Sequence, residues 1–169
     1  VSLTPHITEM LFAIGAGHQV VATDQASDYP ADAVKKLPKV ANYQSLNSES
    51  LLAVKPDLVI AWETGNSPAV IEKLRTLNIP VYLSQPNTLE DIRTEIQTFG
   101  VLAVTESTAN KASKDYNQRL SQLKARYQNR SSVRVFYQIS EVPLMTIGSK
   151  QIITNALTVC GGKNVFDQL

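Results

Sequence analysis

Short runs of β-branched and other apolar residues alternate along this chain with stretches whose apolar residues recur at helical spacing. The clearest run is Leu58–Trp62, in which every position is apolar. Because successive side chains of a strand point to opposite faces of its sheet, an uninterrupted apolar run predicts a strand buried on both faces. Strands that alternate with helices are typical of a parallel sheet covered by helices, so the sequence predicts an α/β fold.

Residues 1–104 carry enough of these elements for one complete α/β lobe with flanking helices. The expected strands are Val1–Leu3, Val20–Thr23, a short piece at Val40, Leu58–Trp62 and Val81–Leu83. The expected helices span about 7–14, 31–36, 50–54, 67–77 and 89–103, and capping signals stand at Thr4-Pro5, Asn47-Ser48, Ser67-Pro68 and Thr88 with Asp91.

The segment from Glu106 to Gln128 contains neither glycine nor proline and predicts one long helix of about 23 residues. We assign residues 105–130 to this connecting helix and residues 131–169 to the start of a second α/β lobe. That lobe is expected to hold a strand at Val133–Ile139, an extended piece at 144–147 and a helix at 152–160. We expect the second lobe to be incomplete, with on the order of 90 further residues in the full protein.

Charge and composition exclude several classes of function. Sixteen basic and fifteen acidic residues are spread without runs, which argues against a nucleic-acid partner or an anionic membrane surface. No apolar stretch approaches the roughly 20 residues that span a bilayer. The single cysteine, Cys160, rules out an internal disulfide framework and a multi-cysteine metal site. No signal peptide precedes Val1, and we expect that a leader has been removed.

The segments that follow each strand are the candidate ligand site, because ligands of open parallel sheets lie beyond the carboxyl ends of the strands. Trp62 and Tyr43 offer flat aromatic faces there, and His6 follows the first strand. Uncharged amide groups come from Gln25, Gln44, Asn66 and Gln85. This inventory suits a bulky, mostly neutral ligand that carries many amides, and it suits a phosphate poorly.

Two of these residues have alternative interpretations. Trp62 ends a buried strand and is also compatible with a plain core tryptophan. His6 could reach a bound metal centre or a ligand amide, but a solvated loop histidine is the simpler interpretation.

An α/β fold serves enzymes as often as binding proteins, so catalytic motifs bear on its function. The sequence has no G-x-G-x-x-G, no G-x-x-x-x-G-K-[ST], no G-x-S-x-G, and no H-E-x-x-H or C-x-x-C. We therefore predict neither catalytic residues nor a metal site. A flavodoxin-like or hydrolase-like α/β enzyme, and a structural or chaperone-like module, remain the alternatives from other classes.

In order along the chain, these segments resemble the class III periplasmic substrate-binding proteins of ABC importers. The motifs that carry the resemblance are Ser2–Pro5 with Thr8-Glu9, Ser27–Pro30, Leu46–Glu49 and Val54–Trp62. Ala61-Trp62 followed by Gly65-Asn66, together with Val159–Phe166, is most similar to the cobalamin (vitamin B12)-binding branch. The resemblance implies a periplasmic protein that captures cobalamin or a related corrinoid in an interlobe cleft and delivers it to the membrane permease subunits of an importer.

The resemblance also implies roles for individual residues. Trp62 and Tyr43 are expected to flank the corrin ring, with Gly65 in the same loop. Ala26 stands where a tyrosine is expected, which removes one stacking group. An importer-docking carboxylate falls by alignment on Pro68, so Glu63 or Glu72 would substitute. No cofactor is implied beyond the transported ligand, and the alternative within the same class is haem or a ferric siderophore.

Overall fold

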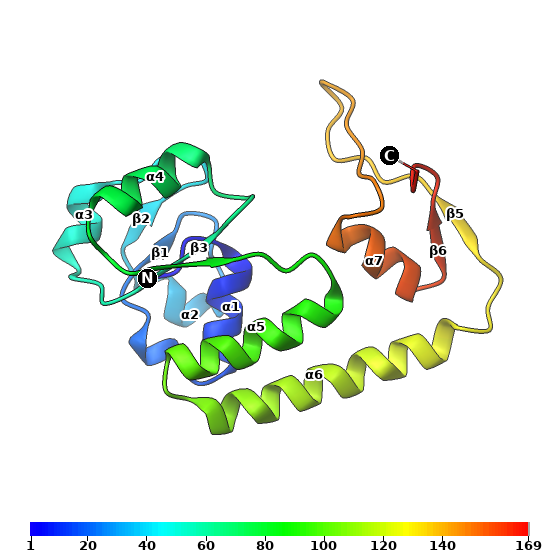
Figure 1. Cartoon of the computed structure of the whole chain (residues 1–169), viewed down its shortest axis with the longest axis horizontal. Helices are drawn as coiled ribbons and strands as arrows, with labels where there is room; N and C mark the ends of the chain where they lie inside the picture. Colours follow the sequence, from blue (N-terminus) through cyan, green and yellow to red (C-terminus); the bar gives the residue numbers. More distant parts are fainter. Residues whose placement is uncertain (169) are drawn as a thin grey trace. The chain divides into compact units, whose positions relative to one another are not determined.

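The computed structural model describes residues 1–168 (Figure 1). Contacts divide the chain into two compact units: unit 1 contains Val1–Gln85 and Ile96–Ala112, and unit 2 contains Pro86–Glu95 and Ser113–Leu169. Leu169 itself lies outside the described residues. None of the helices within residues 1–168 has both the length and the hydropathy required of a membrane span.

Unit 1 is built on a parallel sheet, which confirms the predicted α/β class. The strands are β1 (Thr23–Asp24), β2 (Lys39–Ala41), β3 (Val59–Trp62) and β4 (Val81–Ser84), and β1 pairs with β2 and β3 with β4. Ser2 forms parallel bridges to both Thr23 and Ile60 and so joins the two pairs. The strand expected over Val20–Thr23 begins only at Thr23, because its partner strand β2 begins opposite Thr23, at Lys39; a 3-10 turn, η1 (Gly17–Gln19), precedes this segment.

The helices of unit 1 cover the two faces of this sheet (Figure 1). On one face, Val59 and Ala61 of β3 share a buried core with Leu51 of α3 (Ser48–Ala53) and Leu74 of α4 (Pro68–Thr76). The alternate residues of β3, Ile60 and Trp62, point to the other face. That face carries α1 (Pro5–Ala13) and α5 (Leu89–Leu102), and short α2 (Ala31–Val34) follows β1. Burial on both faces confirms the prediction made from the apolar run.

The predicted capping signals are largely confirmed. The Asn47 side chain accepts a hydrogen bond from Ser50 N at 3.0 Å, and the Ser67 hydroxyl accepts one from Val70 N at 3.3 Å. Thr88 and Asp91 form a reciprocal pair, in which Asp91 N donates to Thr88 Oγ1 at 3.2 Å and Thr88 N donates to Asp91 Oδ2 at 2.8 Å.

Helix α6 spans Glu106–Tyr127 and confirms the predicted long helix. Its first turns cross α5 closely, since a Cβ built on Gly100 would overlap the Cβ of Ala109. The contacts assign Ile96–Ala112, which includes the end of α5 and the start of α6, to unit 1. The rest of both helices belongs to unit 2. The division at 104 and 130 that the sequence suggested treats α6 as a separate connector, and it stays a prediction.

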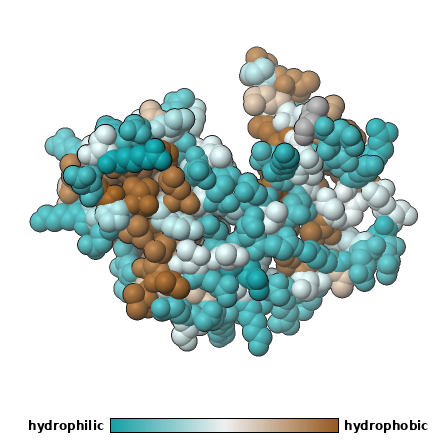
Figure 2. Space-filling view, viewed as in Figure 1, coloured by the Kyte–Doolittle hydropathy of each residue, from teal (hydrophilic) through white to brown (hydrophobic). Residues whose placement is uncertain are grey.

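Unit 2 contains a two-stranded parallel sheet and one helix besides its parts of α5 and α6. Strand β5 (Val133–Val135) pairs with β6 (Gly162–Asn164), and α7 spans Ile152–Val159. The strand expected to reach Ile139 stops at Val135, because its partner β6 is only three residues long. The loop that follows β5 exposes apolar side chains, seen as the brown tip in Figure 2: Ile139, Val142, Leu144 and Met145.

Candidate ligand-binding site

An open pocket of about 770 Å³ lies at the carboxyl edge of the unit 1 sheet. It is formed by the segment after Ser2 and by the loops after β1, β2 and β3, as expected for a parallel sheet. The lining residues are Leu3, Thr4, Pro5, His6, Glu9, Asp24, Gln25, Ala26, Asn42, Tyr43, Gln44, Trp62, Gly65 and Asn66. Eight of the nine residues predicted to bind ligand are therefore brought together, although their contact with a ligand stays a prediction.

Trp62 is held in place by the tight loop that follows it. A Cβ built on Gly65 would overlap the six-membered ring of the Trp62 indole, so the indole lies directly against the glycine backbone. Asn66 is buried and donates from Nδ2 to Leu3 O at 3.2 Å, while its Oδ1 accepts from Trp62 N at 2.8 Å. Asn66 thus ties the loop to the extended segment that contains Leu3, and the ligand contact predicted for Asn66 stays a prediction.

His6 lies in the first turn of α1, half-buried against Trp62, so the interpretation as a solvated loop histidine is wrong. The two rings meet edge to face, with centroids 5.3 Å apart. Burial lowers the pKa of His6 below its ordinary value, and the negative charge of Asp24 opposes that shift. His6 Nε2 and Trp62 Nε1 are both buried, and neither has a hydrogen-bond partner within residues 1–168.

The loop after β2 presents Tyr43 to the pocket. Asn42 shapes this loop, because its Oδ1 accepts from Gln44 N at 2.9 Å and Ser45 N at 2.8 Å. Ser67 at the start of α4 then fixes the loop by donating its N–H to Tyr43 O at 2.9 Å. The Tyr43 side chain itself remains 67% exposed, so its ring face is open for stacking.

The expectation of an uncharged lining is wrong, because Asp24 and Glu9 also line the pocket. Asp24 is the last residue of β1 and immediately precedes Gln25, the first residue of the loop that we predicted to bind ligand. Glu9 lies three residues after His6 and therefore shares its face of α1. Neither lysine nor arginine is among the lining residues, which still disfavours an anionic ligand such as a siderophore.

The remaining predicted residues lie outside this pocket. Gln85 Oε1 accepts from Thr64 N at 3.2 Å and Thr64 Oγ1 at 2.9 Å, which places Gln85 beside the loop after β3. Glu63 and Glu72 are both exposed, and Glu72 forms an exposed ion pair with Arg75 at 3.4 Å. No group of three or more potential metal-ligating His, Cys, Asp or Glu side chains occurs in the described part of the chain.

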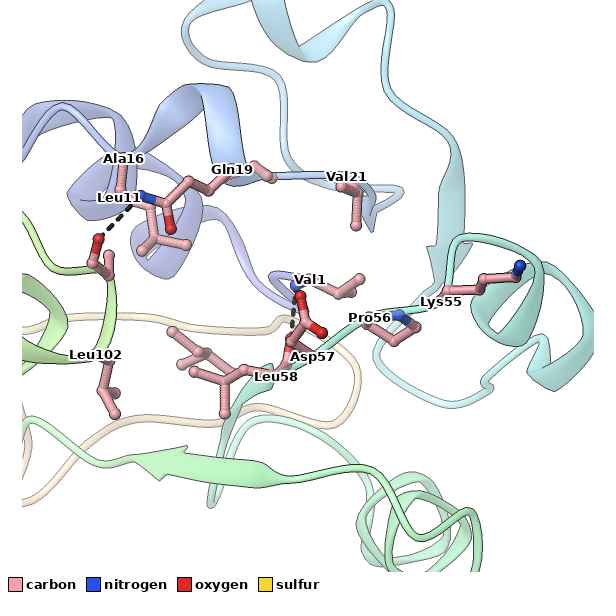
Figure 3. A pocket seen from close by; sticks show the side chains of 13 residues that line it. Val1, Leu11, Ala16, Gln19, Val21, Lys55, Pro56, Asp57, Leu58 and Leu102 are labelled. Carbon is pink, nitrogen blue, oxygen red and sulfur yellow. Dashed lines mark hydrogen bonds between the residues drawn. The ribbon is translucent and has the colours of Figure 1, made fainter.

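A second pocket, of about 500 Å³, lies at the opposite, amino end of the same sheet (Figure 3). Its walls include Val21, Leu58 and Leu102, and its charged residues are Lys55 and Asp57. Gln19 Nε2 closes one side by donating to Ala103 O at 2.9 Å. It contains no tryptophan, tyrosine or histidine and none of the predicted site residues.

The whole chain is similar to known proteins. The family described as periplasmic binding protein matches residues 1–169. The chain is 42% identical over 166 residues to the vitamin B12-binding protein of Vibrio parahaemolyticus and 40% identical to that of Vibrio cholerae; each match covers 98% of this chain and 60% of the relative. The chain thus spans about 60% of the length of the curated relatives it matches.

Solved structures give the same picture of the fold. The crystal structure of the periplasmic vitamin B12-binding protein BtuF of Vibrio cholerae matches with a TM-score of 0.90 at 39% identity, covering 99% of this chain and 66% of that one. A periplasmic haem-binding protein from Pseudomonas aeruginosa matches with a TM-score of 0.82 at 25% identity, covering 96% and 61%.

Proposed function

The chain belongs to the periplasmic binding protein family, and from that premise we propose that it forms part of a periplasmic protein that captures cobalamin for an ABC importer. The observation that carries the proposal is the pocket at the carboxyl edge of the unit 1 sheet. It combines the faces of Trp62 and Tyr43 with uncharged amides, and cobalamin offers a large flat macrocycle bordered by amides. The chain binds its ligand without transforming it.

Haem is the competing ligand of the same size class. The carboxylates of haem would be repelled by the carboxylates of Asp24 and Glu9, and no lysine or arginine among the lining residues would offset that repulsion. The relatives named as vitamin B12-binding are also closer in sequence than the haem-binding neighbours. Both observations support cobalamin over haem.

Isothermal titration tests the proposal. A protein extended to the full length of the relatives should bind cobalamin at one site and more tightly than haemin. The 169-residue chain alone should bind more weakly, because a larger protein can bury more of the ligand surface. Equal affinity of the shorter and the longer protein for cobalamin would contradict a ligand site completed by further chain, and no binding by the longer protein would refute the proposal.

Delivery to the importer requires a surface away from the pocket. We propose Glu63 and Glu72 for that contact, because both are exposed and neither lines the pocket. The Glu72–Arg75 ion pair leaves Glu72 available, since exposed pairs contribute only about 0–1 kcal/mol. Glu63→Gln with Glu72→Gln should lower transport and leave cobalamin affinity unchanged; Glu49→Gln on α3 is the matched control.

A further inference from the structure

A buried carboxylate stands behind the pocket rim formed by the loop after β1. Asp24 is 4% exposed, and its Oδ2 accepts a hydrogen bond from Ala26 N at 3.0 Å. Its Oδ1 accepts from the Ser27 hydroxyl. The carboxylate therefore bends the chain back on itself and fixes Gln25 and Ala26, two residues that line the pocket.

A row of buried hydroxyls continues from this carboxylate into the core. Ser27 Oγ lies 2.7 Å from Thr8 Oγ1, and Thr8 Oγ1 lies 2.7 Å from Ser2 Oγ. Ser2 and Thr8 are 0% exposed and Ser27 is 3% exposed. The row joins the loop after β1 to helix α1 and to the bridging residue Ser2.

The direction of the protons in this row follows from counting donors. A hydroxyl has one proton and an ionised carboxylate has none, so Ser27 must donate to Asp24. Ser27 then accepts from Thr8. Ser2 Oγ and Thr8 Oγ1 each also lie 3.2 Å from Thr4 O, which is a second acceptor for their protons. The shorter 2.7 Å contacts favour the arrangement in which Thr8 accepts from Ser2 and all three protons point toward Asp24, and hydrogen bonds aligned in this way strengthen one another.

We propose that Asp24 is a positioning residue of the ligand pocket: its carboxylate orients the three hydroxyls and holds the rim at Gln25–Ala26 in the shape that binds the ligand. The proposal rests on the proposed function for its effect on ligand affinity. An asparagine offers one acceptor oxygen for the two donors, Ala26 N–H and the Ser27 hydroxyl, so its Nδ2 would face one of them. With Nδ2 facing Ser27, the Ser27 hydroxyl would turn to donate to Thr8, the Thr8 and Ser2 protons would turn to Thr4 O, and the row would reverse its direction.

The Asp24 carboxylate also acts, through His6, on the aromatic wall of the pocket, which is formed by Trp62 and Tyr43. Its charge raises the pKa of His6 against the larger lowering effect of burial, and the His6 ring packs on Trp62. Two other charged groups lie nearby: Glu9 lines the pocket on α1, and Lys39 on β2 donates from Nζ to Ser27 O at 2.7 Å. Trp62 is the only tryptophan of the 169-residue chain, so tryptophan emission measured on that chain reports on this wall with or without ligand.

The experiment compares Asp24→Asn and Ser27→Ala in the full-length protein with Asn47→Ala, which removes the α3 cap outside the pocket. Asp24→Asn and Ser27→Ala should each weaken cobalamin binding about tenfold or more, the scale for losing one hydrogen bond to a charged group. Asn47→Ala should lower only the Tm. Ser27→Thr, which keeps the hydroxyl, should retain the affinity. Asp24→Asn affinity within about twofold of wild type would overturn the proposal.

Two readouts need no ligand and separate this proposal from the proposed function. Amide hydrogen exchange at Ala26 should accelerate in Asp24→Asn, because its N–H loses a charged acceptor. The pH midpoint of Trp62 emission should move lower in Asp24→Asn but not in Ser27→Ala, which retains the charge.

If the wild-type protein failed to bind cobalamin, the proposed function would be refuted. Unchanged hydrogen exchange at Ala26 in Asp24→Asn would independently overturn the positioning role of Asp24. If Asp24→Asn failed to fold, unchanged Ala26 exchange and affinity in Ser27→Ala would overturn it.

Discussion

Replacing Gly65 with alanine should displace the Trp62 indole from its present position. The added Cβ would overlap three atoms of the indole, so the ring rather than the backbone must move. Overpacking of this kind costs typically about 1–3 kcal/mol of the free energy of unfolding. For a unit of this size each 1 kcal/mol lowers Tm by roughly 4–8 °C. Displacing a central aromatic anchor should cost about 2 kcal/mol of binding free energy, or roughly 30-fold in Kd.

Gly17→Ala is the matched control for this variant. A Cβ on Gly17 would overlap the ring of Phe12, so the same substitution creates the same kind of clash, but neither residue lines the ligand pocket. Both variants should lose stability by thermal denaturation. Only Gly65→Ala should shift the Trp62 emission maximum and weaken cobalamin binding by titration calorimetry. If Gly65→Ala kept wild-type emission and affinity, the contact between the glycine and the indole would have no functional consequence, and the reasoning would be refuted.

Three further predictions concern stability. Asn66→Ala should lower the free energy of unfolding in urea by about 1–3 kcal/mol, because it leaves the buried Leu3 carbonyl and Trp62 N–H without their partner; a loss below that range would contradict the structural role. Burial lowers the pKa of His6, so the unfolded chain takes up a proton as pH falls below about 6.5 before the folded chain does, and stability should decline over that window. His6→Asn should reduce that decline and His18→Asn should leave it as in the wild type; what remains in His6→Asn includes the Val1 amino terminus, whose pKa burial lowers to about 6. A decline in His6→Asn equal to that of the wild type would assign it to groups other than His6. Gly100→Ala should lower the free energy of unfolding, because the clash with Ala109 costs about 1–3 kcal/mol and the gain in helix propensity is only about 1 kcal/mol. A higher Tm in this variant would show that α5 and α6 separate at little cost.

Most of the fold of unit 1 could be predicted from local signals. Alternating strand and helix patterns, together with Asn47, Ser67 and the Thr88 and Asp91 pair, located the helices because capping is decided within a few residues. Strand lengths were less predictable, since a strand ends where its partner ends. The sequence did not predict β6, because Gly161-Gly162 has turn composition, whereas the backbone of Gly162 pairs with Val133 of β5.

The members of the pocket were predictable from topology, but the function of each side chain was not. The carboxyl ends of parallel strands meet at one edge, so the sequence placed Trp62, Tyr43 and Gln25 together. Whether an amide faces the ligand or the backbone depends on tertiary contacts, and Asn66 turns its polar atoms to Leu3 and Trp62. Asp24 was missed because a strand-end aspartate has an ordinary turn-forming interpretation.

A crystal structure of the full-length protein with cobalamin would show whether the ligand lies against the aromatic wall at the carboxyl edge of the unit 1 sheet. We expect the corrin macrocycle in van der Waals contact with Trp62 and Tyr43, with Gln25 and Gln44 near its amides. Cobalamin bound at the amino-end pocket beside Leu58, or bound with Trp62 out of contact, would contradict this expectation.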